Sequence, residues 1–569
     1  MKKDSLRNRL SWISLVLLFW SVTPMSAEQF GLFTYEVVEG SVTITDYPNN
    51  GVGEVEIPAE IEGRPVSSIG AAAFRSCDGL TGITIPSSVT SIGNFAFRDC
   101  IALTGITIPP GVTRIESGMF QDCSKLTRIT LPTGLNRIDS SAFKGCVALT
   151  DITIPPGVSI IGSSAFESCS ALTGSITIPP RITRINRETF AGCRGLSGII
   201  IPPSVTSIGA SAFRGCSGLT GITIPLGVTS IGEYTFDDCS GLTSISIPTG
   251  VTTIGDNALR GCRGLTGLTI PPSVTSIGDY TFNGCRGLKS ITIPPGVTTI
   301  GAGAFESCSG LTSIIIPPGV TTIREFTFDG CSGLTGLTIP PGVTTIGRYA
   351  FSECTGLTSI TLPTGLTSIG DRAFVDCKKL TGITIPPGIT IIEAGTFGFC
   401  SGLTDITIPP GVTSIGDNAF RRCTGLMTAL FLGDAPEFED DAFSSVDPEF
   451  TFYYLNGRSG FSSQSWRGHP TIRIDEALQI SAVFSISFTP DGLRLMLPPI
   501  GRLGPLVLPL VNFDRDIGVE YSPDLSPGSW IELGNFFPVE GVWVFTDLDP
   551  VRLARSSGYY RAFLRPIVP

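Results

Sequence analysis

The chain has 569 residues, of which 41% are apolar and only 15% are charged, and its formal net charge is −11. The apolar fraction is too high for a disordered chain. An acidic balance without basic clusters argues against a nucleic-acid-binding protein, which would carry a basic face. The single histidine, His469, argues against multi-histidine metal sites and against most histidine-dependent catalysis.

The segment 1–27 has the pattern of a secretory signal peptide. Four basic residues precede an apolar stretch over 12–22, and Ala27 supplies a small residue at the cleavage point. The stretch is too short to span a bilayer comfortably, and no later one reaches about 18 apolar residues without a charge or proline. We therefore expect a secreted or cell-surface protein with no membrane span after cleavage. An uncleaved membrane anchor is the alternative.

Sixteen cysteines recur with a fixed 23-residue period. The interval is constant along the whole series, except that the one between Cys169 and Cys193 is longer by a single position. Such a period is typical of a solenoid, whose coils bury their apolar residues against neighbouring coils. The sequence therefore predicts fifteen coils over 77–422 instead of several separate domains. The ladder consists of Cys77, Cys100, Cys123, Cys146, Cys169, Cys193, Cys216, Cys239, Cys262, Cys285, Cys308, Cys331, Cys354, Cys377, Cys400 and Cys423.

One coil illustrates the expected local structure. Residues 334–339 alternate between aliphatic and small polar side chains and predict a strand in which Thr338 faces outward. The Pro-Pro-Gly sequence at 340–342 predicts a turn. Residues 343–346 predict a second, shorter extended segment, and residues 347–353 predict a short helical corner.

The cysteines share one repeat position and should stack at the coil spacing of about 4.8 Å. Because their Cβ vectors would run parallel, we predict a ladder of buried free thiols that act as small apolar groups. Disulfides between neighbouring rungs are the alternative in an oxidising compartment. Zinc is disfavoured, since ligands in a line do not form a tetrahedron. A phenylalanine precedes each cysteine by three positions except at Leu259, and we expect it in the core.

The repeat over 77–99 follows the pattern Cys-x-x-Leu-Thr-x-Ile-Thr-Ile-Pro-x-x-Val-Thr-x-Ile-Gly-x-x-Ala-Phe-x-x. It resembles that of the BspA-like, or Treponema pallidum-type, leucine-rich repeats, over roughly residues 42–475. The resemblance implies a right-handed superhelix of 23-residue coils with a parallel β-sheet face. It also implies an N-terminal cap and divergent first repeat at 28–76, and a C-terminal cap at 423–475. Characterised members of the family are surface proteins of bacteria that act in adhesion, and no catalytic residue is common to them.

Most coils place a threonine on the outward face of the strand, and serine or isoleucine stands there at 246, 200 and 315. One interpretation is sheet stabilisation, because threonine favours strands and pairs across rungs. The other is a binding strip of low charge, on the order of 70 Å long. Near-identical coils favour a repetitive or multivalent target. The candidate binding residues are Thr84, Thr107, Thr130, Thr153, Thr177, Thr223, Thr269, Thr292, Thr338, Thr361, Thr384 and Thr407.

The period stops before residues 476–569, which contain short strand-like runs between proline and glycine clusters. This pattern predicts a small β-sandwich-like domain. The runs 483–488 and 493–497 flank a Pro-Asp-Gly turn and predict a hairpin. Surface attachment, carbohydrate binding and a plain structural role all remain open for this module.

No catalytic, cofactor-binding or metal-binding motif is recognisable. His469 belongs to the predicted C-terminal cap, away from the buried cysteines, which argues against a Cys–His dyad. The acidic residues at 437 and 439–441 lack the EF-hand spacing and are interpreted as a solvated loop. We therefore predict a non-enzymatic protein without cofactors that binds protein or surface glycan ligands. The alternatives are a structural envelope or spacer protein, and a glycan-binding accessory protein that acts through 476–569.

Overall fold

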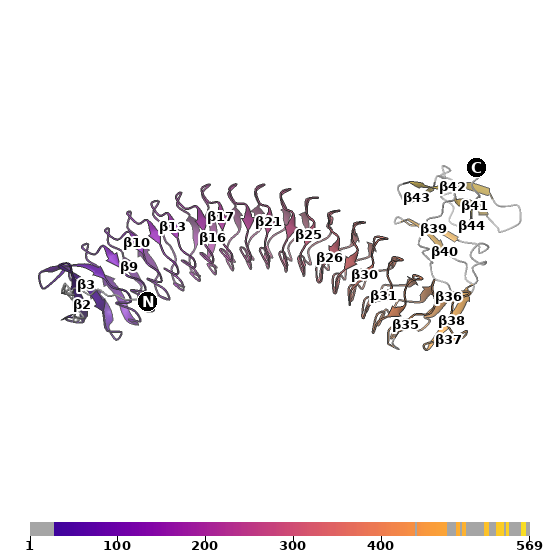
Figure 1. The fold of residues 1–569 in the computed structure, drawn as a ribbon, viewed down its shortest axis with the longest axis horizontal. Coiled ribbons are helices and arrows are strands. Elements are labelled where there is room, and N and C mark those ends of the chain that lie inside the picture. The colour runs from indigo at the N-terminus through magenta and orange to yellow at the C-terminus, as the bar shows by residue number, and fades with distance from the viewer. Residues whose placement is uncertain are drawn as a thin grey trace, which may run out of the picture.

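The structure, a computed structural model, describes residues 28–438 and 441–474, together with the backbone of six strands within 485–564. Residues 28–438 and 441–474 form a β-solenoid that curves into an arc (Figure 1). The predicted array of 23-residue coils is confirmed. Each coil has three sides, and the aliphatic, phenylalanine and cysteine side chains of all three sides point into one continuous core.

The first side of each coil carries the strand that the sequence predicts. Neighbouring strands pair in parallel with a register of one coil, so that Leu337 lies opposite Ile360 and Thr338 opposite Thr361. Leucine and isoleucine point inward and threonine outward, as the alternation predicts. The strands of this side are β4 (Val52–Glu56), β7 (Gly79–Thr84), β9 (Gly105–Thr107), β11 (Arg128–Thr130), β14 (Gly174–Thr177), β16 (Leu196–Ile200), β18 (Gly221–Thr223), β20 (Ser244–Ser246), β22 (Gly267–Thr269), β24 (Ser290–Thr292), β27 (Gly336–Thr338), β29 (Ser359–Thr361), β32 (Asp405–Ile408), β34 (Thr428–Phe431), β36 (Thr451–Leu455) and β38 (His469–Ile474).

The single longer interval between cysteines is absorbed on this first side. Between β14 and β16 the register shifts at Gly174 and Ser175. Gly174 has a φ of 77°, a left-handed conformation that glycine adopts without steric penalty. The extra residue therefore forms a bulge, and the core positions of the coil keep their places in the stack.

The second side carries a shorter strand that begins after the proline turn. It also pairs in parallel, as Thr345 does with Ser368 and Ile346 with Ile369. The strands of this side are β6 (Arg64–Ile69), β8 (Ser91–Ile92), β10 (Arg114–Ile115), β12 (Arg137–Ile138), β13 (Ile160–Ile161), β15 (Arg184–Ile185), β17 (Ser207–Ile208), β19 (Ser230–Ile231), β21 (Thr253–Ile254), β23 (Ser276–Ile277), β25 (Thr299–Ile300), β26 (Thr322–Ile323), β28 (Thr345–Ile346), β30 (Ser368–Ile369), β31 (Ile391–Ile392), β33 (Ser414–Ile415) and β35 (Glu437–Phe438).

The third side corrects one prediction, because it consists of turns instead of a short helical corner. Tyr349 and Glu353 both have a φ of 54°, in the left-handed region. This conformation points alternate N–H groups along the solenoid axis. The N–H groups of Tyr349, Phe351 and Glu353 donate to carbonyl oxygens of the next coil at 3.0, 2.8 and 2.9 Å. A helix would have used these donors within the coil, so stacking of coils replaces the helix.

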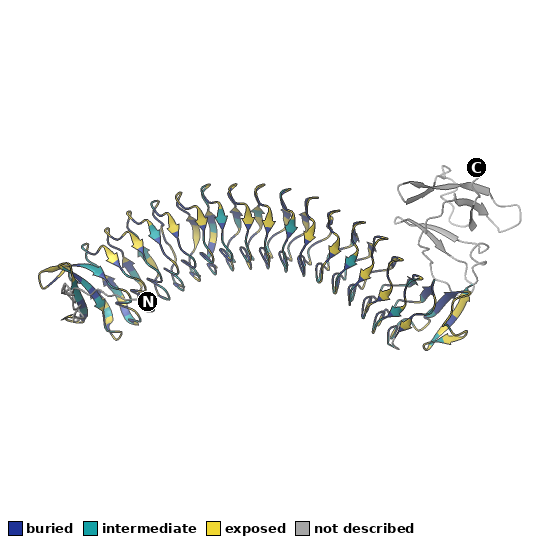
Figure 2. Ribbon diagram, viewed as in Figure 1, coloured by how far each residue is buried: buried dark blue, intermediate teal, exposed yellow. Residues whose placement is uncertain are grey.

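The phenylalanines of the third side stack along the axis of the core. The rings of Phe97 and Phe120, for example, have centroids 5.5 Å apart and an interplanar angle of 3°. Leu259 is fully buried in the same column and separates the rings of Phe236 and Phe282. Figure 2 shows the alternation of buried and exposed residues that encloses this core along the arc.

Both ends of the solenoid are closed. At the N-terminal end, β1 (Glu28–Phe30), β2 (Phe33–Val38) and β3 (Ser41–Asp46) pair antiparallel in that order, and β5 (Glu60–Ile61) pairs antiparallel with β6. At the other end, β37 (Ser465–Trp466) pairs with β38, and the Trp466 ring contacts Phe438 and Phe452. These aromatic side chains cover core that the terminal coils would otherwise expose.

The C-terminal module contains the predicted hairpin strands and a second sheet. β39 (Ser485–Thr489) and β40 (Gly492–Met496) form the expected antiparallel hairpin pair. A second antiparallel sheet has the strand order β43-β42-β41-β44. Its strands are β41 (Ile517–Ser522), β42 (Ile531–Val539), β43 (Val542–Phe545) and β44 (Tyr559–Leu564).

Candidate functional site

The outward surface of the first side is formed by three columns of small residues, which we call the hydroxyl face. In the coil that begins at Cys77 these are Thr81, Gly82 and Thr84. The first column is mostly threonine, the second is mostly glycine or serine, and the third contains the candidate binding threonines. Of those twelve threonines, all are exposed except Thr407, which is half-buried.

The hydroxyl groups of the first column are used within the protein. Thr104 Oγ1 donates to the carbonyl oxygen of Thr81 at 3.1 Å, and Thr127 Oγ1 donates to that of Thr104 at 2.9 Å. The same bond recurs at intervals to Thr404, which donates to Thr381 at 3.3 Å. This column therefore stabilises the stack of coils. Sequence reasoning missed it, although the column has the same period as the cysteines.

The hydroxyl groups of the candidate column are not used in this way. Among residues 28–438, none of the twelve candidate threonines donates or accepts a side-chain hydrogen bond, unlike the neighbouring Thr104 and Thr127. Each hydroxyl therefore offers one donor and two acceptor lone pairs to a ligand. Threonine thus stabilises the stack of coils in the first column, whereas the hydroxyl groups of the third column are left available to a ligand.

The hydroxyl face has little charge. From Cys77 to Thr407 its three columns contain four charged side chains, those of Arg128, Asp151, Lys289 and Asp405. Two exceptions to the threonine column are exposed and apolar, with exposed fractions of 58% for Ile200 and 83% for Ile315. The hydroxyl face is therefore complementary to a partner whose surface is uncharged or has mixed charges, and not to a highly charged partner.

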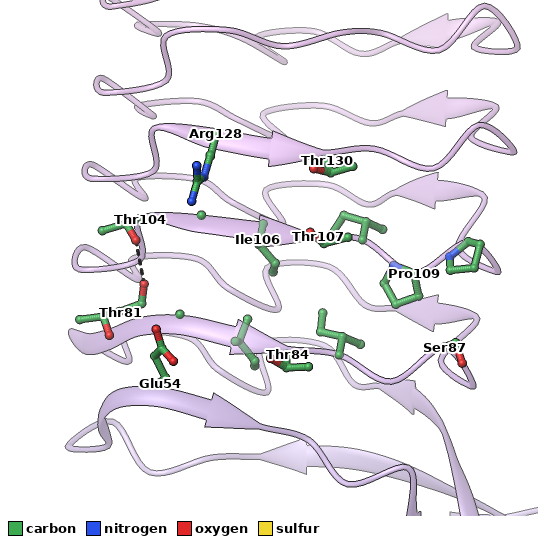
Figure 3. A pocket seen from close by; sticks show the side chains of 16 residues that line it. Glu54, Thr81, Thr84, Ser87, Thr104, Ile106, Thr107, Pro109, Arg128 and Thr130 are labelled. Carbon is green, nitrogen blue, oxygen red and sulfur yellow. Dashed lines mark hydrogen bonds between the residues drawn. The ribbon is translucent and has the colours of Figure 1, made fainter.

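A depression of about 530 Å³ lies on the N-terminal part of this face. Figure 3 shows Thr84, Thr107 and Thr130 in line along its floor, with Glu54 and Arg128 at opposite ends. Gly82 and Gly105 leave the strand backbone bare between these two charges. A Cβ at Gly105 would lie 3.3 Å from Cγ of Arg128, so the glycine makes room for that side chain.

The cysteines are buried and free, as predicted. They are not simply small apolar groups, however. Each thiol from Cys100 to Cys423 donates a hydrogen bond to the carbonyl oxygen of the core residue three positions before the preceding cysteine, as Cys123 does to Phe97 at 3.0 Å. Burial raises the pKa of most of these thiols, to about 12 for Cys216 and Cys285. The ladder is therefore structural.

The remaining candidates form no site. His469 packs edge-on against the rings of Phe450 and Phe452, and burial lowers its pKa. Of the acidic loop, residues 439–440 lie outside the described residues. In the part of the chain that the structure describes, no group of three or more His, Cys, Asp or Glu side chains could hold a metal ion, and no helix is long and apolar enough to cross a membrane.

The chain is similar to known repeat proteins. Residues 51–173, 172–286, 252–347 and 321–448 match the family described as BspA type leucine rich repeat region. A leucine-rich repeat protein from Bacteroides ovatus ATCC 8483 is 30% identical, with a TM-score of 0.52, over 75% of this chain and 99% of that chain. A leucine rich cell surface protein from Faecalibacterium prausnitzii A2-165 is 28% identical, with a TM-score of 0.34, over 72% and 95% of the two chains. The T. pallidum leucine rich repeat protein is 25% identical, with a TM-score of 0.22, over 50% and 91%. None of the curated proteins matches the chain.

Proposed function

Because the chain belongs to the BspA-type leucine-rich-repeat family, we propose that it is a non-enzymatic adhesion protein that binds a protein partner through the hydroxyl face. One observation carries the proposal. The candidate threonines present a row of hydroxyl groups that no side chain or backbone group of the described solenoid engages. The adjacent glycines and serines leave strand backbone accessible beside that row, so that a flat partner surface can approach closely.

The arrangement favours an extended contact over a single pocket. Equivalent groups recur in most coils, so that several weak contacts act together on one partner. The low charge of the face makes association less dependent on salt than a charged patch would be. Adhesion through many neutral hydrogen bonds fits a protein that remains attached under changing ionic conditions.

The binding face is tested by substitutions on two sides of neighbouring coils. We expect the full chain to bind saturably to intact cells or immobilised extracellular-matrix proteins. Thr269→Arg with Thr292→Arg, on β22 and β24, should weaken this binding at least about tenfold, because each arginine blocks the hydroxyl row. The matched control is Thr253→Arg with Thr299→Arg, on exposed positions of β21 and β25. Equal binding by both pairs, or no binding by the unaltered chain, would contradict the proposal.

We also propose that the protein is exported after removal of residues 1–27. The first strand, β1, begins at Glu28, directly after the proposed cleavage point. Expression of the complete chain in a bacterial host, followed by mass spectrometry of the exported protein, should give a mature N-terminus at Glu28. A retained N-terminus in the membrane fraction would instead support the uncleaved anchor.

A further inference from the structure

A second groove lies on the third side of the coils, away from the hydroxyl face. Its volume is about 520 Å³, and we call it the tyrosine groove. It is lined by Tyr234, Asp256, Asn257, Arg260, Asp279, Tyr280, Asn283 and Glu306. Both tyrosine rings are half-buried, and the groove runs along the solenoid axis across four successive coils.

The two tyrosines stand at backbone positions that disfavour them. Tyr234 has a φ of 54° and Tyr280 a φ of 55°. Left-handed backbone is unfavourable for a bulky side chain and favours glycine or asparagine. Other coils have those residues at the same repeat position, as at Asn257, Gly303 and Asn418. Folding therefore does not require an aromatic ring here. Phe95, Phe326 and Tyr349 occupy the same position elsewhere, so it is the two tyrosines that line one groove which point to binding.

Both rings are held in place by their neighbours. Tyr280 lies over Gly303, where any side chain would collide with the ring. The Arg260 guanidinium lies 5.7 Å from the centroid of Tyr234 and donates to both carboxylate oxygens of Asp237, at 2.8 and 3.1 Å. Asp237 is fully buried, so this ion pair braces the Tyr234 ring. The groove is therefore formed before any ligand binds.

The groove offers polar groups between and beside its two rings. Asp256 Oδ1 accepts from the N–H of Asp279, and Asp279 Oδ1 accepts from the N–H of Ala302, both at 2.8 Å. The second oxygen of each carboxylate is left for a ligand. Asn283 and Glu306 add further donors and acceptors.

The charges around the groove disfavour an anionic ligand. The lining contains the carboxylates of Asp256, Asp279 and Glu306 but only one guanidinium, that of Arg260. The charge of Arg260 is already paired with Asp237. Arg324 lies beside the groove and pairs with Asp279 Oδ1 at 3.3 Å. Both cations are thus engaged by carboxylates of the protein itself, and the remaining carboxylates would repel a polyanion.

The spacing of the rings narrows the chemistry of the ligand. Tyr234 and Tyr280 are two coils apart, which is about 10 Å at a coil spacing of about 4.8 Å. This distance is comparable to one disaccharide unit of an extended polysaccharide. Aromatic faces combined with amide and carboxylate groups suit a sugar, which has apolar ring faces and a rim of hydroxyl donors.

We infer that the tyrosine groove binds an extended, uncharged polysaccharide that lies along the solenoid axis. Sugar rings pack on Tyr234 and Tyr280, and the hydroxyls of the intervening unit bond to Asp256 and Asn257. Asp279, Asn283 and Glu306 bond to hydroxyls at the Tyr280 end of the groove. The next aromatic pair along the axis does not extend the site, because Phe326 and Tyr349 stack on each other at 5.2 Å and Arg348 covers both rings. This site does not depend on the hydroxyl face, which lies on another side of the coils.

The test is affinity electrophoresis of the full chain in gels that contain hydroxyethylcellulose, glucomannan or xyloglucan, with polygalacturonate as the anionic polymer. At least one neutral polymer should retard the chain, and polygalacturonate should not. Tyr234→Asn and Tyr280→Asn should each raise the dissociation constant about fivefold, and together more than about twentyfold. Their melting temperatures should be unchanged or raised, because asparagine tolerates the left-handed backbone.

Phe95→Asn is the matched control, because Phe95 has the same repeat position and a φ of 58° but lies outside the groove. This variant and the pair Thr269→Arg/Thr292→Arg should both keep the retardation. The inference would be overturned if no neutral polymer retards the unaltered chain, if the double tyrosine variant is retarded equally, or if polygalacturonate retards it more. Loss of protein binding in the threonine variant alone would bear only on the proposed function.

Discussion

The thiol of Cys100 donates a hydrogen bond to the carbonyl oxygen of Phe74, 3.0 Å away in the preceding coil. The same carbonyl accepts from the N–H of Cys77 at 3.3 Å, within its own coil. The cysteine side chain thus links two coils at a place where the turn of the third side leaves an acceptor with a free lone pair. Alanine would fill a similar space but would leave this lone pair without a donor.

The first prediction concerns the reactivity of the thiols. All sixteen cysteines are buried and free, so the native protein should not react with a thiol reagent such as dithionitrobenzoate at pH 8. In guanidinium chloride without a reductant, the same sample should release sixteen equivalents. Fewer equivalents after denaturation would show that neighbouring rungs had formed disulfides, and rapid labelling of the native protein would contradict the buried ladder.

The second prediction concerns alkaline pH. Burial raises the pKa of Cys216 and Cys285 to about 12, whereas the thiols of the unfolded chain ionise near their ordinary pKa of about 8.5. Between these values the unfolded state has fewer bound protons than the folded state, so stability falls as the pH rises. Each such thiol removes about 1.4 kcal/mol for each pH unit in this window.

The urea midpoint, followed by circular dichroism, should therefore fall steeply between pH 8 and pH 10. A sample denatured and refolded at pH 8 serves as the control for irreversible chemistry. An equal midpoint at both pH values would show that the thiols ionise in the folded protein.

The third prediction concerns the one gap in the phenylalanine stack of the described solenoid. Leu259 is fully buried between the rings of Phe236 and Phe282. Each of these two rings stacks on the phenylalanine on its other side. Leu259→Phe should restore the stack and raise the free energy of unfolding by about 1 kcal/mol, because ring pairs add to area burial. Leu259→Ala should lower it by about 2–5 kcal/mol. A destabilised Leu259→Phe variant would show that the surrounding coils have closed around the smaller side chain.

The fourth prediction concerns the buried carboxylate of Asp237. It accepts from Arg260 at 2.8 Å and pairs with Arg214 at 3.3 Å. Burial raises its pKa, while the hydrogen bond from Arg260 opposes that shift. Asp237→Ala should lower the free energy of unfolding by about 2 kcal/mol, because charged hydrogen bonds are lost inside the protein.

Arg187→Ala is the matched control for Asp237. Arg187 pairs with Glu188 at 2.9 Å, but its side chain is 68% exposed. Its removal should change stability by less than about 0.5 kcal/mol in a urea titration. Similar losses for the two variants would show that Asp237 is solvated more fully than its burial indicates.

The sequence by itself determined the coil. A cysteine at the same place in every coil, aliphatic residues at Leu337 and Ile339 and an outward Thr338 specify a strand that only stacked neighbours can bury. The same pattern recurs in each coil, so the strand predicted for one coil is supported by the equivalent residues of all the others. The prediction of a helical third side is wrong. Its left-handed residues, such as Tyr349, are needed for hydrogen bonds to the next coil, and a local pattern does not record those bonds.

Only the tertiary structure decided which groups are available for binding. In the sequence, Thr104 and Thr107 look alike, yet Thr104 donates to the preceding coil and Thr107 has no such bond. Likewise, Tyr234 and Tyr280 line one groove because each coil advances the chain by only about 4.8 Å. A solenoid converts a long separation in sequence into contact between neighbours. The fold follows from the period, and the sites follow from the few positions at which neighbouring coils differ.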